Sequence, residues 1–450
     1  MKKLFTKTLY IAVCITTAVA CKPKLETPSI DKGSLDLSTY VAIGNSITAG
    51  YADNALYRKG QENSYAKLLA EQFQLAGGGE FRMPYVSETS VGIGGPPTFS
   101  SRLTLSYVTD CNNVTSLSPK VIAPSGDFGV FASVYAAQGP FNNFGVPGAK
   151  SFHVPYPRYG DPSNIGKYNP FFVRMTSAAN ASVLSDAMLR NPTFFSLFIG
   201  NNDVLLYALA GAASDSITAT PIFNASIDAI LTTLTAGGAK GVVGNIPDIT
   251  ALPNFTTVPY NGLVLTRQGQ VDSLNGGYIA FNTAYSTNIT FQLGQNPFII
   301  ADAAAPGGRR KILSSEYVLL SVPQDSLKCY KMGSVTPIPN KYILTANEIT
   351  TIKNATDAYN LKLKTAADVH NLAFVDANAF LKSAITGLTF DGIKVSTTFV
   401  SGGAFSLDGV HLTPLGNALL ANEFIRSINA KYGATLPQVD VTKYHGVVFP

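Results

Sequence analysis

Two groups of residues, far apart in the chain, have types suited to nucleophilic chemistry: Gly44-Asn45-Ser46 and Asp408-Gly409-Val410-His411. A serine hydroxyl becomes a useful nucleophile when a neighbouring base takes its proton, and histidine titrates in the range for that task. Ser46 is therefore a candidate nucleophile, and His411 a candidate base. By itself Gly-Asn-Ser is also ordinary turn chemistry, so the hypothesis needs partners from elsewhere in the chain.

Two further clusters could supply hydrogen-bond donors, namely Asn143-Phe144-Gly145 and Gly200-Asn201-Asn202-Asp203. Backbone N–H groups and side-chain amides stabilise the negative oxygen that forms when a nucleophile attacks a carbonyl group. Each cluster also has a structural interpretation, because Asn202 and Asp203 suit a helix cap, Gly145 a turn and Asp408 a loop charge.

Two of the polar clusters, at Ser46 and at Gly200, directly follow segments that have the pattern of buried strands, whereas Asp408 and His411 lie on the loop just before the last predicted helix. Apolar runs at residues 40–44, 193–199, 240–246 and 371–376 predict strands. Helices are predicted from Ser64, from Thr220-Pro221 to Gly237, over residues 346–369, and from Thr413-Pro414. Alternating strands and helices predict an α/β fold with a mostly parallel sheet, whose strand ends meet at one edge.

The four clusters, in this chain order on an α/β pattern, resemble the SGNH hydrolases, the GDSL-type esterases and lipases. The resemblance implies a flavodoxin-like three-layer α/β/α sandwich and hydrolysis of carboxylic esters. It also implies that Ser46 is the nucleophile and that His411 is the base oriented by Asp408. The oxyanion-hole donors would come from Ser46, Gly145 and Asn202. One residue departs from the family pattern, since Asn45 stands where aspartate is usual.

Other titratable residues have weaker claims to a role. Asp376 is a rival for the orienting acid, because it ends the last predicted strand and strand ends face the crevice. His153, His370 and His445 lie in no matching motif and are expected at the surface or in packing. Histidine and cysteine pairs at ligand spacing are absent from the sequence, so we expect no catalytic metal, and no cofactor is implied.

Residues 38–450 are interpreted as one domain with an insertion at about 249–344. Prolines recur in the insertion and no clean helical period can be followed there, so we expect it beside the sheet, with a lid as one interpretation. Loops around a fixed site set the shape of its pocket, and the insertion should therefore influence the choice of substrate.

The first twenty residues have the pattern of a secretion signal: lysines, a short apolar run, then Ala18-Val19-Ala20 before Cys21. Two cleavage modes compete, ordinary signal peptidase and a lipoprotein pathway in which Cys21 is lipidated. Ala18 departs from the leucine usual in a lipobox. Lipidation is favoured, which predicts an exported lipoprotein of the bacterial cell envelope, with residues 21–37 as a tether to the membrane.

Removal of residues 1–20 lowers the formal net charge from +5 to +2, because the segment holds three lysines and no acid. No dense basic run remains, so a nucleic-acid partner is not indicated. Cys111 and Cys329 would be the two unmodified cysteines. In an exported protein they can form one disulfide, and two separately buried thiols are the alternative.

The sequence therefore predicts a membrane-anchored serine esterase that cleaves lipid acyl esters or acetyl and acyl esters of glycans. Two other functions remain open at this level. One is a glycan-binding surface lipoprotein that keeps the fold without catalysis, and the other is an acyltransferase that uses the same residues.

Overall fold

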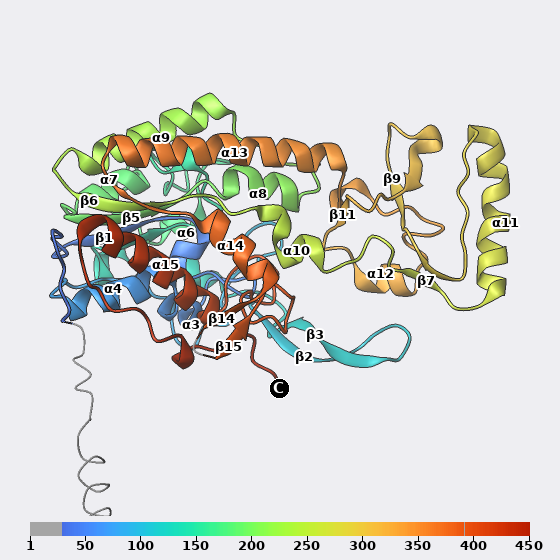
Figure 1. Ribbon diagram of the computed structural model, residues 1–450, viewed down its shortest axis with the longest axis horizontal. Coiled ribbons are helices and arrows are strands. Elements are labelled where there is room, and N and C mark those ends of the chain that lie inside the picture. The colour runs from blue at the N-terminus through green and yellow to red at the C-terminus, as the bar shows by residue number, and fades with distance from the viewer. Residues whose placement is uncertain (1–28, 391) are drawn as a thin grey trace, which may run out of the picture.

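A computed structural model of the protein describes residues 29–390 and 392–450 (Figure 1). Its centre is a parallel five-stranded sheet in the order β13-β6-β5-β1-β4. The strands are β1 Tyr40–Gly44, β4 Asn143–Gly145, β5 Phe194–Phe198, β6 Lys240–Gly244 and β13 Ala373–Val375. Numbered along the chain this order is 2-1-3-4-5, the flavodoxin-like order, so the predicted fold class is confirmed.

Helices cover both faces of the sheet (Figure 1). On one face α4 (Tyr65–Leu75) packs against α15 (Pro414–Tyr432), and on the other α9 (Thr220–Thr235) packs against α13 (Ala346–Val369). Shorter helices complete this part: α2 Ser46–Ala49, α3 Arg58–Glu62, α5 Tyr135–Gln138, α6 Pro170–Val173, α7 Val183–Met188, α8 Asn202–Leu209 and α14 Ala377–Thr386. The predicted caps are present, since Ser64 accepts the N–H of Lys67 and Thr413 that of Gly416.

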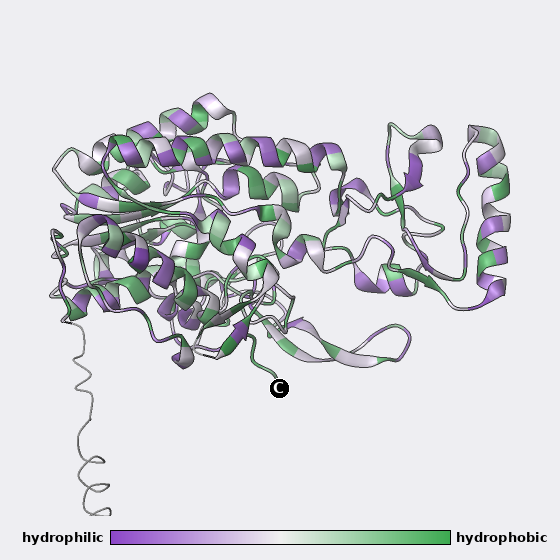
Figure 2. Ribbon diagram, viewed as in Figure 1, coloured by the Kyte–Doolittle hydropathy of each residue, from purple (hydrophilic) through white to green (hydrophobic). Residues whose placement is uncertain are grey.

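The sheet is the apolar centre of the molecule. Every residue of β1 and β5 is buried, as expected for parallel strands covered on both faces. Aromatic side chains fill the space around them, and Tyr40 contacts Phe73, Phe81 and Phe194. Figure 2 shows the hydrophobic residues gathered along these strands.

Residues 258–344, which we call the lobe, project from one end of the sheet domain (Figure 1). The lobe has apolar clusters of its own, one around Phe298 and Ile300 and one around Val271 and Tyr278. The short helix α10 (Pro253–Thr256) leads into it. Its elements are β7 Leu263–Leu265, α11 Gln268–Tyr285, β8 Gly294–Asn296, β9 Ile299–Ala301, β10 Arg309–Lys311, β11 Tyr317–Val318, α12 Gln324–Lys328 and β12 Ile343–Leu344.

The helix α11 corrects one expectation, because no clean helical period is visible in its sequence. Only Val271 and Tyr278 of its 18 residues are buried, and it contains Gly269, Gly276 and Gly277. A helix that packs along so little of its length needs no continuous apolar stripe. Its sequence therefore lacks the usual signal.

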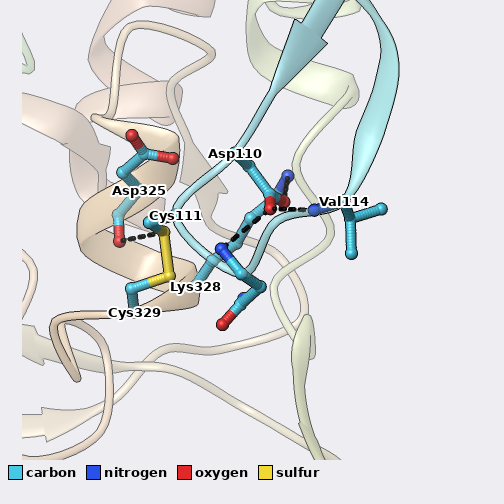
Figure 3. Close-up of a disulfide and its surroundings, with 7 residues drawn as sticks. Asp110, Cys111, Val114, Asp325, Lys328 and Cys329 are labelled. Carbon is cyan, nitrogen blue, oxygen red and sulfur yellow. Dashed lines mark hydrogen bonds and ion pairs between the residues drawn. A yellow bond between two sulfur atoms is a disulfide. The ribbon is translucent and has the colours of Figure 1, made fainter.

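Outside both the central sheet and the lobe, the described residues form two hairpins: β2 (Leu103–Thr109) with β3 (Thr115–Val121), and β14 (Leu388–Phe390) with β15 (Ile393–Val395). The tip of the first hairpin is joined to the lobe by a disulfide between Cys111 and Cys329 (Figure 3). Beside it, Lys328 Nζ lies 3.1 Å from Asp110 Oδ2. Of the two alternatives for these cysteines, the structure has the bonded pair.

The described end of the predicted tether belongs to the folded domain. Leu35 and Leu37 are buried, and the Ser34 N–H donates to the carbonyl of Tyr432 at 3.2 Å. The domain therefore begins before the predicted residue 38. Residues 1–20 and Cys21, on which the predictions of export and lipidation rest, lie outside the described residues.

None of the helices in the described residues combines the length and the apolar character needed to cross a membrane.

Candidate active site

Ser46 lies at the carboxyl end of β1, where the chain turns directly into α2. Gly44 ends the strand, and a Cβ atom there would overlap the side chain of Thr48, so the turn requires glycine. Asn45 is the N-cap of α2 and accepts the N–H of Ile47 at 3.1 Å. Asparagine and aspartate cap helices equally well, which explains how the turn accommodates asparagine at this position.

His411 lies between Ser46 and Asp408, although the serine is 365 residues away in the chain. Its Nε2 is 2.8 Å from Ser46 Oγ, and its Nδ1 is 2.8 Å from Asp408 Oδ2. The imidazole ring packs against Tyr51 with ring centroids 4.7 Å apart. The structure therefore brings three of the sequence-predicted residues into one hydrogen-bonded chain.

The side chain of Asp408 is only 9% exposed, and both of its oxygens accept hydrogen bonds. Its Oδ1 accepts the N–H groups of Val410 and His411, each at 2.8 Å, and its Oδ2 accepts that of Asn54 at 2.9 Å. Burial by itself would raise the pKa of this carboxyl. The charge of His411 and the hydrogen bonds from His411 and Asn54 outweigh burial and hold the pKa of Asp408 well below its usual range. The carboxylate stays ionised beside the imidazole.

The predicted oxyanion donors lie in different surroundings. Asn202 is buried at the start of α8, and its Nδ2 donates to the carbonyl of Ala149 at 2.9 Å, which leaves its second amide hydrogen available. The Gly145 N–H, in contrast, donates to Asn143 Oδ1 at 2.8 Å. That group is already used inside β4, which contradicts the expectation that it is free to bind an oxyanion.

Gly148 lies three residues further on and has the features expected for Gly145. Its φ is +79°, and a Cβ there would meet only Asn169 Nδ2, at 3.8 Å. Its N–H donates no hydrogen bond to any of the described residues. The carbonyl of Ala149, one residue after Gly148, accepts from Asn202, so the Ala149–Lys150 peptide lies against the Asn202 side chain.

The rival acid and the remaining histidines lie elsewhere. Asp376 caps α14 by accepting the Ala379 N–H at 2.9 Å, and it also accepts from Asn245 at 2.8 Å. His153 stacks on Tyr159, with ring centroids 4.6 Å apart. His370 Nδ1 is 2.9 Å from Thr235 Oγ1, and His445 is bonded to the carbonyl of Gly446.

A narrow apolar cavity of about 80 Å³ opens beside Ser46 and His411. Side chains from α14, the β14–β15 hairpin and α15 form its walls, among them Leu381, Ala384, Leu388, Val395 and Leu420. Asn201 also lines it, and Asn201 Oδ1 is a buried acceptor without a partner among the described residues. Ser46 and His411 therefore face a pocket suited to an apolar group.

Several supporting residues were not singled out from the sequence. Tyr51 packs on the imidazole, and Ser406 Oγ is 3.1 Å from Asp408 Oδ1. Ser406 in turn accepts the N–H of Asp53 at 3.0 Å, while Asn54 supplies its own N–H to Asp408. Except for the contact of Ser406 with Asp408, these contacts join residues more than about 350 positions apart, so no local sequence pattern indicates them.

No group of three or more His, Cys, Asp or Glu residues within the described ranges is arranged to hold a metal ion.

The fold and this cluster define a flavodoxin-like α/β protein with a serine, a histidine and a carboxylate at the carboxyl end of its central strand. Over residues 40–424 the chain matches the model of the GDSL-like Lipase/Acylhydrolase family, and it belongs to that family. It is therefore an enzyme that hydrolyses ester bonds.

Three solved structures are also similar to this chain. A lipase/acylhydrolase from Enterococcus faecalis is 12% identical with a TM-score of 0.33, covering 89% of this chain and 99% of its own. An alpha/beta hydrolase enzyme from the metagenome of Lake Arreo is 10% identical with a TM-score of 0.34, covering 88% and 97%. A putative GDSL-like lipase from Parabacteroides merdae is 12% identical with a TM-score of 0.34, covering 89% and 99%. No curated protein sequence matches the chain.

Proposed function

We propose that the protein is a serine esterase in which Ser46 attacks the carbonyl carbon of a carboxylic ester. The observation that carries the proposal is the position of His411, whose two ring nitrogens lie 2.8 Å from Ser46 Oγ and from Asp408 Oδ2. A base within hydrogen-bond reach of the nucleophile, itself oriented by a buried carboxylate, is the arrangement that nucleophilic catalysis by serine requires.

The reaction follows from this geometry. As the bond from Ser46 Oγ to the carbonyl carbon forms, His411 Nε2 takes the hydroxyl proton, and it gives that proton to the alcohol oxygen as the ester bond breaks. Water then attacks the acyl group on Ser46 with His411 again as base, releasing the acid and restoring the serine. Asp408 holds the proton on Nδ1 and stabilises the imidazolium that forms twice in each cycle.

The oxyanion needs fixed donors, and we infer that these are the N–H of Ser46, the free amide hydrogen of Asn202 and the N–H of Gly148. Gly148 replaces Gly145 in this set because the Gly145 N–H is occupied by Asn143. The support for Gly148 is its uncommitted N–H and the contact of the neighbouring Ala149 carbonyl with Asn202.

The cavity beside Ser46 favours an apolar acyl group. An acetyl group would leave most of its apolar wall unfilled, and a filled apolar wall stabilises the bound substrate. The free volume of about 80 Å³ is small beside the roughly 300–1,000 Å³ of pockets for larger ligands. We therefore expect esters of short to medium acyl chains to be better substrates than acetyl esters or esters of long fatty acids.

The nucleophile is tested with an alkyl fluorophosphonate, which traps an activated serine covalently. We expect one adduct, located on Ser46 by mass spectrometry, and slow labelling after His411→Ala. Ser46→Ala should abolish both labelling and ester hydrolysis. An adduct on another serine, or hydrolysis that survives Ser46→Ala, would exclude Ser46 as the nucleophile.

The acyl preference is tested with p-nitrophenyl esters from acetate to palmitate. Ala384→Leu narrows the cavity, so we expect turnover of the octanoate to fall at least about tenfold while that of the acetate changes little. Ala379→Leu on the exposed side of the same helix is the matched control. Equal loss for all chain lengths would show that the cavity does not hold the acyl group.

From the sequence we further propose that Cys21 is lipidated and holds the exported protein at a membrane. Cys21→Ala should move the protein from the membrane fraction to the soluble fraction. Retention of the variant in the membrane fraction would contradict a lipid anchor at this residue.

A further inference from the structure

A second cavity lies within the lobe, apart from the site at Ser46. Its volume is about 1030 Å³, at the upper end of the roughly 300–1,000 Å³ usual for ligand pockets. It is enclosed by α11 and β7 on one side and by α12 and residues 331–335 on the other. None of its lining residues lines the cavity beside Ser46.

The lining carries positive charge only. Arg267, Arg309, Lys328 and Lys331 line the cavity, and no aspartate or glutamate does. Lys328 pairs with Asp110, whereas no carboxylate lies within ion-pair distance of the other three among the described residues. A partly enclosed cavity whose lining charges are all positive concentrates anions.

The guanidinium of Arg309 lines this cavity and makes few hydrogen bonds with the protein. Its Nε is buried without a hydrogen-bond partner, its Nη1 makes a long contact of 3.4 Å to the carbonyl of Val335, and the hydroxyl of Tyr278 lies nearby. The guanidinium lies over the ring of Phe281, 5.1 Å from the centroid. The Nη end of the guanidinium has no strong acceptor, so it can donate hydrogen bonds to an anionic ligand that enters the cavity.

The helix α11 contributes two glycines to the lining of the cavity as well as larger side chains. Gly269 and Gly277 of α11 line it, and a Cβ at either position would meet no atom within 4 Å. Glycine inside a helix costs roughly 0.5–1 kcal/mol relative to alanine, and no packing in the lobe requires it at these positions. The remaining walls are apolar, with Leu274, Phe281, Phe298 and Leu327 among them.

We propose that the lobe cavity binds an amphiphilic anion, an apolar chain that carries a carboxylate or phosphate head group. The head group accepts hydrogen bonds from Arg309 with the charges of Arg267 and Lys331 nearby, and the chain lies along the two lining glycines of α11 against Phe281 and Phe298. A planar guanidinium suits either head group. The site is independent of the proposed chemistry at Ser46.

The test uses the full-length Ser46→Ala protein and three monomeric probes: oleate, an ether-linked lysophosphatidylglycerol, and oleyl alcohol as the neutral control. Binding is measured by titration calorimetry, and a diazirine analogue of oleate is crosslinked and mapped by mass spectrometry. We expect crosslinks in residues 258–335, and binding of one or both anions at least about tenfold tighter than that of the alcohol. Binding of oleate alone identifies a free fatty acid, and binding of the phospholipid identifies a lipid head group.

Two neighbouring glycines give matched variants. Gly277→Leu fills the cavity, whereas Gly276→Leu places the same side chain in open space outside the lining. Both remove a helix glycine, so both should keep or raise the melting temperature. We expect Gly277→Leu to abolish the lobe crosslinks and Gly276→Leu to retain them, and Arg309→Gln to weaken anion binding about tenfold or more. Crosslinks confined to residues outside the lobe, or equal binding by both leucine variants, would overturn the proposal.

Discussion

The carboxylate of Asp408 binds several groups of its own loop and holds that loop in place. It accepts the N–H groups of Val410 and His411 and the imidazole Nδ1 on its own loop, and the N–H of Asn54 from a distant segment. The same contacts that keep the carboxylate ionised also fix the orientation of the imidazole. A change of charge at this residue should therefore alter the tautomer and orientation of the histidine more than it alters the stability of the fold.

Asp408→Asn should lower kcat by roughly 10³- to 10⁴-fold, because an amide at this position favours the wrong tautomer of His411. Substrate binding should change little, since Asp408 is buried behind the imidazole. The variant is measured with p-nitrophenyl butyrate beside Asp376→Asn, which should remove only a helix cap. Normal turnover in the first variant and loss in the second would transfer the orienting role to Asp376.

Gly145 and Gly148 should respond differently to alanine. A Cβ at Gly145 overlaps the backbone of Thr48 and Ala49, so Gly145→Ala should destabilise the fold by about 1–3 kcal/mol or more. Gly148→Ala has space but a strained φ, which costs about 1–2 kcal/mol and is relieved by turning the peptide. We expect this variant to stay folded and to lose about tenfold or more in kcat. Full activity in folded Gly148→Ala would remove Gly148 from the oxyanion site.

At the scale of elements, the β2–β3 hairpin and the lobe are the two long additions to the sheet domain, and a covalent bond joins them. The disulfide links residues 218 positions apart, and the ion pair of Lys328 with Asp110 lies beside it. A cross-link over so long a loop removes many conformations from the unfolded chain.

The double variant Cys111→Ser/Cys329→Ser should lose about 2–4 kcal/mol of stability, measured by urea unfolding. The lobe lies apart from Ser46, so ester hydrolysis at low temperature should be kept. Thiol titration of the unfolded wild-type protein, without reductant, should detect neither Cys111 nor Cys329. Two free thiols there, with unchanged stability in the variant, would contradict the bond.

For the whole molecule, the pH dependence of stability should reflect His153. Burial and the charge of Lys150 lower the pKa of this histidine from 6.5 to about 4. Between these values the unfolded chain binds the additional proton, so stability is fully present above pH 6.5 and is lost as the pH falls towards 4. The greatest loss from this group is about 3 kcal/mol.

His153→Gln keeps a polar side chain that can accept the Lys150 N–H but does not titrate. We expect the difference in unfolding free energy between pH 7 and pH 4.5 to be about 2–3 kcal/mol smaller in this variant than in the wild type. His445→Gln, at an exposed histidine, is the control and should follow the wild-type curve. Parallel curves for all three proteins would show that His153 is not the group responsible.

The sequence by itself determined the elements that have strong local signals. The continuous apolar runs of β1 and β5, the cap at Ser64 and the proline start of α15 are each encoded within a few residues. Strands alternating with helices allow few arrangements other than a parallel sheet, and the clusters at Ser46 and Gly200 then fall at its carboxyl edge. The resemblance to a known family implied that the other two clusters join them there. Fold class and candidate site residues were therefore readable from short segments.

The tertiary structure alone decided which of these residues meet. It placed Asp408 rather than Asp376 beside His411, used the Gly145 N–H within β4, and bonded Cys111 to Cys329. It also formed α11, whose few buried residues leave no periodic pattern. The physical reason is the same in each case: contacts between residues hundreds of positions apart depend on loop paths and packing, which no local spacing of residue types encodes.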